Sequence, residues 1–272
     1  MSALSPIIIL TGASRGLGLA VLSLLLSHHN ARVTTLSRSS TTELQNTVKQ
    51  YGEDRVLAIQ GDVGDAEVNA GAVKQTVDKW GGIDGLVLNA GTMSIFRLDA
   101  VPLEYIPGYI ETNLSSSIYL IQPALPYLRK STLPSPLSSS TTSKSTGRIV
   151  LVSSGASSKG YVAWGLYSAV KAALNSVART LAAEENLNGS GVGVWAIRPG
   201  LVDMQDLLRS SGAESMHPNE FARLKTAYDE GNLLRPEQPG SVLAGLVARG
   251  GPMDLSGEYL NWADERLLAY RT

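Results

Sequence analysis

A tyrosine and a lysine four residues apart are the side chains whose types and spacing best suit chemistry in this sequence. Tyr167 and Lys171 lie in a helical pattern, and residues i and i+4 share one helix face, so the Lys171 ammonium can lie close to the phenol. A free tyrosine has a pKa of about 10, and a neighbouring positive charge favours the phenolate and lowers that pKa. The pair is therefore predicted to exchange protons near neutrality, with Ser153 and Ser154 ending the preceding predicted strand.

A glycine-rich segment, residues 11–18 (Thr-Gly-Ala-Ser-Arg-Gly-Leu-Gly), separates the first predicted strand from the first predicted helix. Glycines let the backbone turn sharply and approach a pyrophosphate, and the free N–H groups and positive dipole end of the following helix attract that anion. A tight turn that binds nothing is the alternative. The cofactor contacts predicted here are Gly12, Ser14, Arg15, Gly16, Leu17 and Gly18.

The end of the second predicted strand indicates which dinucleotide binds. An acidic side chain there would accept a hydrogen bond from the adenosine ribose of NAD, but the strand ends Leu36-Ser37-Arg38, with no carboxylate. Arg38 and Arg15 can pair with a 2′-phosphate through charge-assisted hydrogen bonds. NADP(H) is therefore the predicted cofactor, the alternative being that Arg38 is a solvated loop arginine.

Two further segments follow predicted strands at the edge where open α/β sheets bind ligands. Asp62, with Val63 beside it, is placed to accept a hydrogen bond from the adenine amine, although an aspartate that caps the next helix is almost as good an interpretation. Asn89, Ala90 and Gly91 follow the fourth strand and are interpreted as the floor of the cofactor site or merely as a turn.

These residues need a framework that brings strand ends together. Short aliphatic runs alternate with longer helical patterns, which is typical of repeated βαβ units. We expect an α/β fold: a single Rossmann-type doubly wound domain over residues 1–272, with a seven-stranded parallel sheet flanked by helices on both faces. Residues 131–146, rich in Ser, Thr and Pro, are expected to form a flexible, solvated loop. The expected strands are residues 7–10, 32–36, 56–60, 86–89, 148–152, 192–197 and 258–260, and the expected helices are residues 16–27, 42–51, 66–80, 105–129, 166–185, 219–230 and 239–248.

Composition narrows the class of protein. The 272 residues are 43% apolar, enough for one sizeable core, and the formal net charge of -1 gives no reason to expect nucleic acid or an anionic membrane as a partner. There is no cysteine and the three histidines lack the spacing of a zinc site, so no metal site is predicted. The apolar run at residues 7–10 follows no basic region and is too short to span a bilayer, so we expect a cytoplasmic protein with a small-molecule ligand.

Six motifs, in order, resemble those of the short-chain dehydrogenase/reductase superfamily over nearly the whole chain. Finer similarity, at residues 164–167, 171–175, 180–182 and 257–260, resembles the fungal benzil reductases and their sepiapterin-reductase-like relatives. The six motifs are the glycine segment Thr11–Gly18, Asn89-Ala90-Gly91, Asn113, Ser154, Tyr167 with Lys171, and Pro199-Gly200.

The resemblance implies a catalytic tetrad. Tyr167 would donate its proton to a substrate carbonyl oxygen as hydride arrives from the nicotinamide, and Ser154 would hydrogen-bond that oxygen. Lys171 would hold the nicotinamide ribose and tune Tyr167, and Asn113 would bind a water that resupplies the proton. Each also has a structural interpretation: a packing tyrosine, a solvated lysine, a local backbone hydrogen-bonder for Asn113 and a turn residue for Ser154.

The chain departs from the family pattern after Pro199 and Gly200. The family commonly carries a threonine a few residues later that binds the nicotinamide carboxamide, but residues 201–205 read Leu-Val-Asp-Met-Gln. Backbone groups around Val202 are the expected substitute, unless this segment closes differently. The departure puts cofactor affinity in doubt more than catalysis.

The segments expected to wall the substrate pocket follow Gly91, precede Tyr167 and follow Gly200. Their side chains are apolar and partly aromatic, which suits flat, moderately large carbonyl compounds such as aromatic diketones. Packing in the core is the alternative for several of them. The predicted pocket residues are Met93, Ile95, Trp164, Met204 and Leu208.

The sequence as a whole predicts an NADPH-dependent carbonyl reductase acting on benzil-like or sepiapterin-like ketones and diketones. One alternative is an NAD(P)-dependent alcohol dehydrogenase working in the oxidative direction, and another is a non-catalytic NADP(H)-binding sensor. The sensor would not need Ser154, Tyr167 and Lys171 together. Small alanine side chains along residues 166–185 let another helix approach, and the resemblance implies a homodimer or homotetramer.

Overall fold

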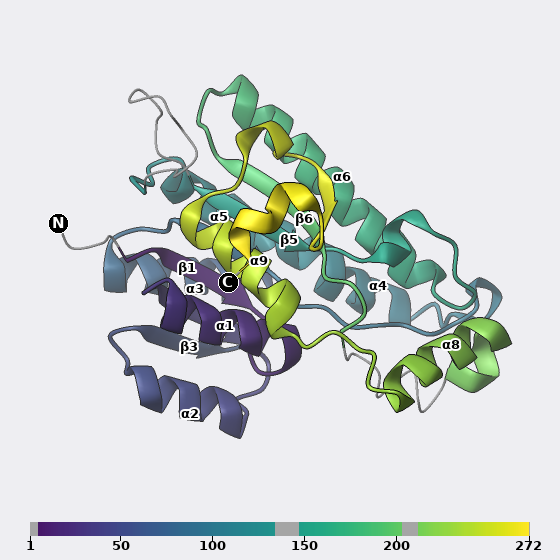
Figure 1. Ribbon diagram of the computed structural model, residues 1–272. Helices are drawn as coiled ribbons and strands as arrows, with labels where there is room; N and C mark the ends of the chain where they lie inside the picture. The colour runs from purple at the N-terminus through teal and green to yellow at the C-terminus, as the bar shows by residue number, and fades with distance from the viewer. Residues whose placement is uncertain (1–4, 134–146, 203–211, 272) are drawn as a thin grey trace.

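The computed structural model of the protein describes residues 5–133, 147–202 and 212–271 (Figure 1). In that part of the chain the strands form one sheet in the order β3-β2-β1-β4-β5-β6-β7, and each neighbouring pair is parallel. The strand order reverses between β1 and β4, as in a doubly wound sheet. The predicted seven-stranded parallel sheet is therefore confirmed. The strands are β1 (Ile7–Thr11), β2 (Arg32–Ser37), β3 (Val56–Gln60), β4 (Gly85–Leu88), β5 (Arg148–Val152), β6 (Gly193–Arg198) and β7 (Tyr259–Asn261).

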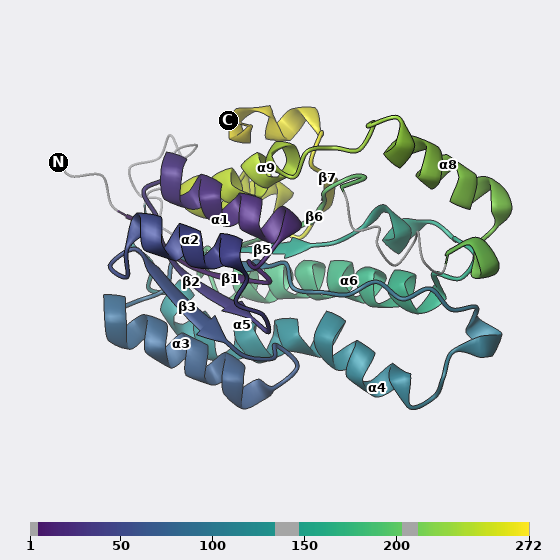
Figure 2. The same ribbon diagram turned by 90° about the horizontal axis from the view of Figure 1, so that it is seen from below.

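Helices cover both faces of the sheet. Figure 2 shows α1, α2 and α9 on one face and α3, α5 and α6 on the other. Side chains from these helices bury both faces of the strands, as a parallel sheet requires. The helices are α1 (Gly16–His28), α2 (Thr42–Tyr51), α3 (Ala66–Trp80), α4 (Tyr105–Ile110), α5 (Ser116–Leu128), α6 (Gly165–Leu187), α8 (Pro218–Asp229) and α9 (Glu237–Arg249).

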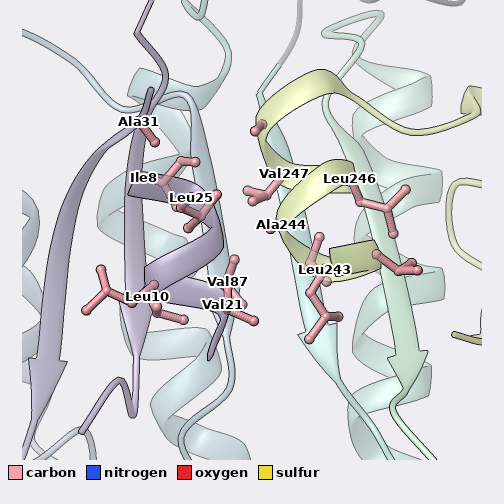
Figure 3. Close-up of a cluster of buried hydrophobic side chains, with 14 of the residues drawn as sticks. Ile8, Leu10, Val21, Leu25, Ala31, Val87, Leu243, Ala244, Leu246 and Val247 are labelled. Carbon is pink, nitrogen blue, oxygen red and sulfur yellow. The ribbon is translucent and has the colours of Figure 1, made fainter. Parts of the chain in front are cut away.

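Alternation along each strand divides the buried side chains between two cores. In β1, Ile8 and Leu10 belong to the core that contains side chains of α1 and α9, whereas Ile9 belongs to the core on the opposite face. Successive strand side chains point to opposite faces, and this produces the split. Figure 3 shows the first core, where apolar side chains of α1 and α9 meet those of β1 and β4.

One expected helix, residues 105–129, has nearly the predicted extent but is not uniform. α4 and α5 are joined without a break by a π-helical turn of five residues, Glu111–Ser115. Such turns are frequent at functional sites. A pattern of apolar residues with a period near 3.6 does not reveal an inserted π turn, so the sequence could not predict it.

Residues 131–146 were predicted to form a solvated loop, and this prediction is wrong for the first residues of that range. Ser131 and Leu133 are buried, and the Ser131 hydroxyl donates a hydrogen bond to Oδ1 of Asp84, 2.7 Å away, just before β4. This contact anchors the chain as it leaves α5. Residues 134–146 lie outside the described part of the chain. The other expected elements end within two residues of the observed ones, at positions where element ends commonly fray.

Candidate active site

The residues predicted to do chemistry lie at the end of the sheet where the parallel strands finish. β1 leads into the glycine loop, β4 into Asn89, β5 into Ser153 and Ser154, and β6 into Pro199. Figures 1 and 2 show α4 and α8 extending beyond this same end of the sheet. The carboxyl ends of the strands, near the reversal of strand order, are where open α/β sheets bind ligands.

The glycine loop folds so tightly that no side chain fits at two of its positions. Gly12 has a φ of +72°, which L residues rarely adopt, and a Cβ on it would lie 2.9 Å from Cα of Ala90. A Cβ on Gly18 would lie 2.1 Å from the carbonyl oxygen of Gly12. α1 then begins at Gly16 with no side-chain cap on its first N–H groups. These open N–H groups and the helix dipole fit a pyrophosphate.

The other residues of the loop support it. Ser14 is buried, and its carbonyl oxygen accepts a hydrogen bond from the Thr41 hydroxyl at 2.7 Å. Leu17 is half-buried and packs against the core between α1 and α9. The loop is therefore fixed from the α2 side as well as from the core.

Asn89 holds the glycine loop from the neighbouring strand. Its Nδ2 donates hydrogen bonds to the carbonyl oxygens of Thr11 and Gly12, at 3.0 and 3.1 Å. In return, Oγ1 of Thr11 accepts from the N–H groups of Asn89 and Ala90, at 3.1 and 3.0 Å. The sequence interpretation of this segment missed the role of the Asn89 side chain as a support, because the partners are 78 and 77 positions apart along the chain.

The residues predicted to select the cofactor lie beside this loop. β2 ends at Ser37, whose Oγ accepts a hydrogen bond from the Ala13 N–H at 3.0 Å, so the strand end is tied to the loop. Arg15 and Arg38 are both exposed, and within the described residues neither guanidinium has a hydrogen-bond or ion-pair partner. Both charges are therefore available to an anionic ligand.

Asp62 and Val63 follow β3 as predicted, but Asp62 does not cap the next helix. The N-cap of α3 is Asp65, whose carboxylate accepts hydrogen bonds from two N–H groups of the first turn. The Asp62 carboxylate accepts from the Gly64 N–H at 2.9 Å and so belongs to the turn before the helix. The capping alternative for Asp62 is wrong, because α3 begins three residues too late for it. Val63 is buried in a small apolar cluster with side chains of β2 and α3.

Tyr167 and Lys171 lie on α6, and both side chains are buried, with 6% and 5% of the residue surface exposed. Nζ of Lys171 lies 5.9 Å from the centre of the Tyr167 ring and donates a hydrogen bond to the Val152 carbonyl oxygen at 2.8 Å. Burial lowers the pKa of Lys171 to about 8. Burial also raises the pKa of Tyr167, and a hydrogen bond with the Ser154 side chain opposes that rise.

The net shift of the Tyr167 pKa is therefore upward, and the lowered pKa predicted from the spacing of Tyr167 and Lys171 is not found. Burial disfavours the phenolate and outweighs the other effects on the Tyr167 pKa, while the ammonium donates to the Val152 carbonyl. A phenol whose pKa lies above its ordinary value is protonated at neutral pH. The phenol therefore carries the proton that a general acid needs, while the raised pKa makes it a weaker acid than a free tyrosine.

The two serines after β5 have different surroundings. Oγ of Ser153 donates a hydrogen bond to Oδ1 of Asn175 at 2.6 Å, within the packing between β5 and α6. Oγ of Ser154 accepts from the Ala156 N–H at 3.2 Å, as expected of a turn residue, and the Ser154 side chain lies close enough to the Tyr167 phenol to oppose the rise in its pKa. Ser154 is therefore the serine next to the phenol, and its structural and chemical interpretations are compatible.

Asn113 lies in the π-helical turn and is 1% exposed. Its Oδ1 accepts a hydrogen bond from the Thr92 N–H at 2.9 Å, and its Nδ2 donates to Oγ1 of Thr92 and the Tyr109 carbonyl, at 3.2 and 3.0 Å. A Cβ on Gly91 would lie 3.0 Å from this Oδ1 and 3.6 Å from Nζ of Lys171, so the three residues converge. The hydrogen bonds of the Asn113 side chain are local, as its structural interpretation expects, and its water-binding role stays a prediction.

Pro199 and Gly200 follow β6 as predicted. Gly200 has a φ of +77°, and a Cβ on it would lie 2.6 Å from Cδ1 of Leu234. Val202 is buried and forms an isolated parallel β-bridge with Leu234. Residues 201–205, where a threonine was expected from the resemblance, lie only partly in the described chain, because residues 203–211 are outside it.

An apolar cluster, which we name the Tyr167 cluster, adjoins the catalytic residues. Ile95, Trp164 and Tyr167 are buried members, Met93 packs against them, and the Trp164 and Tyr167 rings meet edge to face at 5.9 Å. The predicted pocket residues Met204 and Leu208 lie outside the described residues. Several members were not predicted from the sequence. Those in α8 and in the turn before it lie far from Tyr167 along the chain, and their apolar pattern does not show which element they pack against. The members that were not predicted are Ala156, Ala163, Met216 and Leu224, with Leu201 and Phe221 packed against them.

The fold and this site define a class of protein. A doubly wound parallel sheet, a glycine loop that opens an uncapped helix and a buried tyrosine and lysine beside a serine are the parts of a dinucleotide-dependent oxidoreductase. Over residues 5–133, 147–202 and 212–271 there is no group of three His, Asp or Glu side chains that could hold a metal ion. No helix in the same ranges is long and apolar enough to cross a membrane.

Comparisons with known proteins identify the family. The family model for short chain dehydrogenases matches residues 6–215. The (S)-benzoin-forming benzil reductase of Saccharomyces cerevisiae is 32% identical over 272 residues, which cover 97% of this chain and 98% of that protein. A solved short-chain dehydrogenase/reductase of Saccharomyces cerevisiae has a TM-score of 0.88 and 30% identity, covering 98% of this chain and all of its own. The solved KRED1-Pglu enzyme has a TM-score of 0.83 and 36% identity, covering 94% of this chain and all of its own. The chain belongs to the short-chain dehydrogenase/reductase family, as the sequence motifs predicted.

Proposed function

We propose that the protein is an NADPH-dependent carbonyl reductase that transfers hydride to a ketone or diketone bearing aromatic groups. The observation that carries the proposal is the buried Tyr167 phenol, which lies beside Lys171 at an apolar cluster and close enough to the Ser154 side chain for that side chain to lower its pKa. Oxidation of an alcohol would require the phenolate as proton acceptor, and burial disfavours the phenolate. Carbonyl reduction starts from the protonated phenol, which is the form that burial favours, and reduction is the direction we propose.

Bound NADPH would supply the hydride, and side chains of this protein would handle the proton. The Tyr167 hydroxyl donates its proton to the substrate carbonyl oxygen, and the Ser154 hydroxyl hydrogen-bonds the same oxygen as negative charge develops there. Lys171, whose pKa of about 8 keeps it mostly protonated at neutral pH, stabilises the phenolate that remains. In this proposal Asn113 holds a water that returns the proton through Lys171.

NADP(H) is the proposed cofactor because Arg15 and Arg38 carry unpaired positive charges beside the end of β2, where no carboxylate stands. The cradle itself fits a dinucleotide, since the tight turn at Gly12 and Gly18 leads into the uncapped first turn of α1, whose N–H groups can bind a pyrophosphate. The other proposed cofactor contacts are Ser14, Gly16, Leu17, Asp62, Val63, Asn89, Ala90, Gly91, Tyr167, Lys171, Pro199, Gly200 and Val202.

The substrate class is proposed from the Tyr167 cluster and from the similarity to a benzil reductase. Met93, Ile95 and Trp164 supply apolar and aromatic surface next to the phenol. An apolar wall binds flat, uncharged carbonyl compounds better than anionic ones. A protein 32% identical over nearly its whole length is named for reducing benzil, an aromatic diketone.

The test is NADPH oxidation by the purified protein against benzil, other aromatic diketones and sepiapterin, with NADH in parallel. We expect turnover with NADPH and a loss of about 100-fold or more in kcat for Tyr167→Phe, because the general acid is removed. Tyr51→Phe, on α2 and remote from the site, is the control and should leave kcat unchanged. NADPH binding with no turnover of any carbonyl would support the sensor alternative, and faster alcohol oxidation than carbonyl reduction would support the dehydrogenase alternative.

Association into a homodimer or homotetramer and a cytoplasmic location are part of the same proposal. Ala169 and Ala172 of α6 are exposed small side chains against which a second helix could pack closely, whereas Ala178 and Ala182 are used in the core. Light scattering of the purified protein tests the association, and a monomer at micromolar concentration would contradict it. Fractionation of the cells that make the protein tests the location.

A further inference from the structure

Thr92, the residue after Gly91, forms hydrogen bonds through its N–H, its carbonyl oxygen and its hydroxyl. All three bonds are with Tyr109 or Asn113. The Tyr109 hydroxyl donates a hydrogen bond to the Thr92 carbonyl oxygen at 3.0 Å. Asn113 accepts from the Thr92 N–H at 2.9 Å and donates to its hydroxyl oxygen at 3.2 Å. Asn113 also donates to the Tyr109 carbonyl, so the two residues that hold Thr92 are bonded to each other. Thr92 cannot rotate without breaking at least one of these bonds.

The segment that starts at Thr92, residues 92–96, leads from this anchor to the catalytic helix. The Phe96 N–H donates to the Ala163 carbonyl oxygen at 2.9 Å, and Phe96 forms an isolated parallel β-bridge with Trp164. Ala163 has a φ of +68°, which is strained for a residue other than glycine and marks a tightly determined position. The segment is therefore fixed at α4 on one side and just before Tyr167 on the other. The proposed pocket residues Met93 and Ile95 lie between these two ends.

Tyr109 itself lies close to the catalytic groups. It is 3% exposed, and its pKa is raised first by burial and then by the neighbouring Tyr167 phenol. Its ring lies 5.3 Å from the Tyr105 ring, which in turn meets the Phe96 ring edge to face at 5.4 Å. α4 thus contacts the segment 92–96 at both ends, through Tyr109 at Thr92 and through Tyr105 at Phe96.

We propose that Tyr109 is a positioning residue for the carbonyl reduction: by holding the Thr92 carbonyl, its hydroxyl keeps residues 92–96 in register and the pocket wall against the Tyr167 phenol. The inference rests on the proposed function. Without the hydroxyl, the Thr92 carbonyl loses its donor and the wall gains freedom to shift. Small misplacements of a substrate relative to its proton donor reduce turnover strongly.

Tyr109→Phe removes only this hydroxyl, and Tyr105→Phe is the matched control. Tyr105 lies on the same helix in ring contact with Tyr109, and within the described residues its hydroxyl has no hydrogen-bond partner. For Tyr109→Phe we expect kcat/KM for the best carbonyl to fall about tenfold, the effect of one lost hydrogen bond to a part-buried acceptor. The Kd for NADPH should change less than about twofold, because the glycine loop is untouched. Amide hydrogen exchange at Thr92 and Phe96 should become about tenfold faster.

The outcomes separate this inference from the proposed function. If the protein without substitutions reduces no carbonyl, the proposed function is wrong, and so is the inference that rests on it. An active unchanged protein whose Tyr109→Phe variant matches it in kcat/KM overturns the inference alone. Faster exchange of residues 92–96 with an unchanged kcat/KM would show a purely structural role for the hydroxyl and would overturn the inference too. The Tyr105→Phe control should leave both measurements within about twofold of the unchanged protein.

Discussion

At the scale of single residues, burial determines how the proposed proton donor behaves. Tyr167 and Lys171 were identified from their spacing in the sequence, which places both on one helix face. Spacing carries no information about solvent, so the sequence predicted a lowered phenol pKa where burial raises it. Lys171 has a pKa lowered to about 8 for the same reason. The residue types were predictable, and the direction in which their surroundings shift the phenol pKa was not.

Cofactor choice is proposed to depend on two exposed arginines, Arg15 and Arg38, of which Arg38 directly follows β2. Arg38→Ala should raise the KM for NADPH about tenfold or more, because a charge-assisted hydrogen bond contributes roughly 1.5–3 kcal/mol. The KM for NADH should stay unchanged, since NADH has no 2′-phosphate. Arg32→Ala is the control, because Arg32 is an exposed arginine at the other end of the same strand. Equal effects of Arg38→Ala on NADPH and NADH in steady-state kinetics would remove Arg38 from the proposed 2′-phosphate site.

At the scale of elements, the strands and most helices were predictable because buried parallel strands read as short apolar runs between helical patterns. What the sequence missed are contacts between elements distant in the chain. Asn89 of the segment after β4 supports the loop after β1, and the Tyr259 hydroxyl of β7 donates to the Ser154 carbonyl at 2.8 Å. The π-helical turn around Asn113 was missed because one inserted turn scarcely alters the periodicity of its helix.

The glycine loop offers a prediction at this scale. Gly18→Ala should abolish or greatly weaken NADPH binding and lower the free energy of unfolding by about 1–3 kcal/mol, because its Cβ would lie 2.1 Å from the Gly12 carbonyl oxygen. Gly71→Ala on α3, where a Cβ would meet nothing within 4 Å, is the control. It should raise stability by about 0.5–1 kcal/mol and leave binding unchanged. NADPH titration and chemical unfolding measure both quantities, and tight NADPH binding by Gly18→Ala would contradict the described loop geometry.

At the scale of the whole molecule, one ion pair links the ends of α5 and α6 on the face of the sheet opposite α1. The Arg129 guanidinium donates to both oxygens of the buried Glu185 carboxylate, at 2.9 and 2.6 Å, and the Ser190 hydroxyl donates to it as well. Hydrogen bonding from Arg129, more than any other effect, lowers the pKa of Glu185. A group whose pKa is lower in the folded state stabilises the fold above its unfolded pKa, about 4.3 for glutamate, and loses that contribution as the pH falls through the folded value.

Removing the guanidinium while keeping the alkyl chain tests this link. Arg129→Met should lower the free energy of unfolding by about 1–2 kcal/mol at pH 7, a reduced figure because Arg129 is itself partly exposed. The deficit should shrink toward acid pH, where Glu185 becomes protonated. Arg223→Met, which removes an exposed i,i+3 pair with Glu220 on α8, should have little effect at any pH. Urea unfolding across pH measures the difference, and a deficit that does not depend on pH would contradict the electrostatic explanation.

The central claim is that the protein reduces a carbonyl with hydride from NADPH and a proton from Tyr167. The most direct measurement is transfer of deuterium from NADPH that carries deuterium at both C4 positions of the nicotinamide into the alcohol formed from benzil, for the unchanged protein and for Tyr167→Phe. We expect deuterium on the carbinol carbon with the unchanged protein, and formation of the same alcohol at least about 100-fold slower with the variant. Alcohol without deuterium, or labelled alcohol formed equally fast by Tyr167→Phe, would contradict the claim.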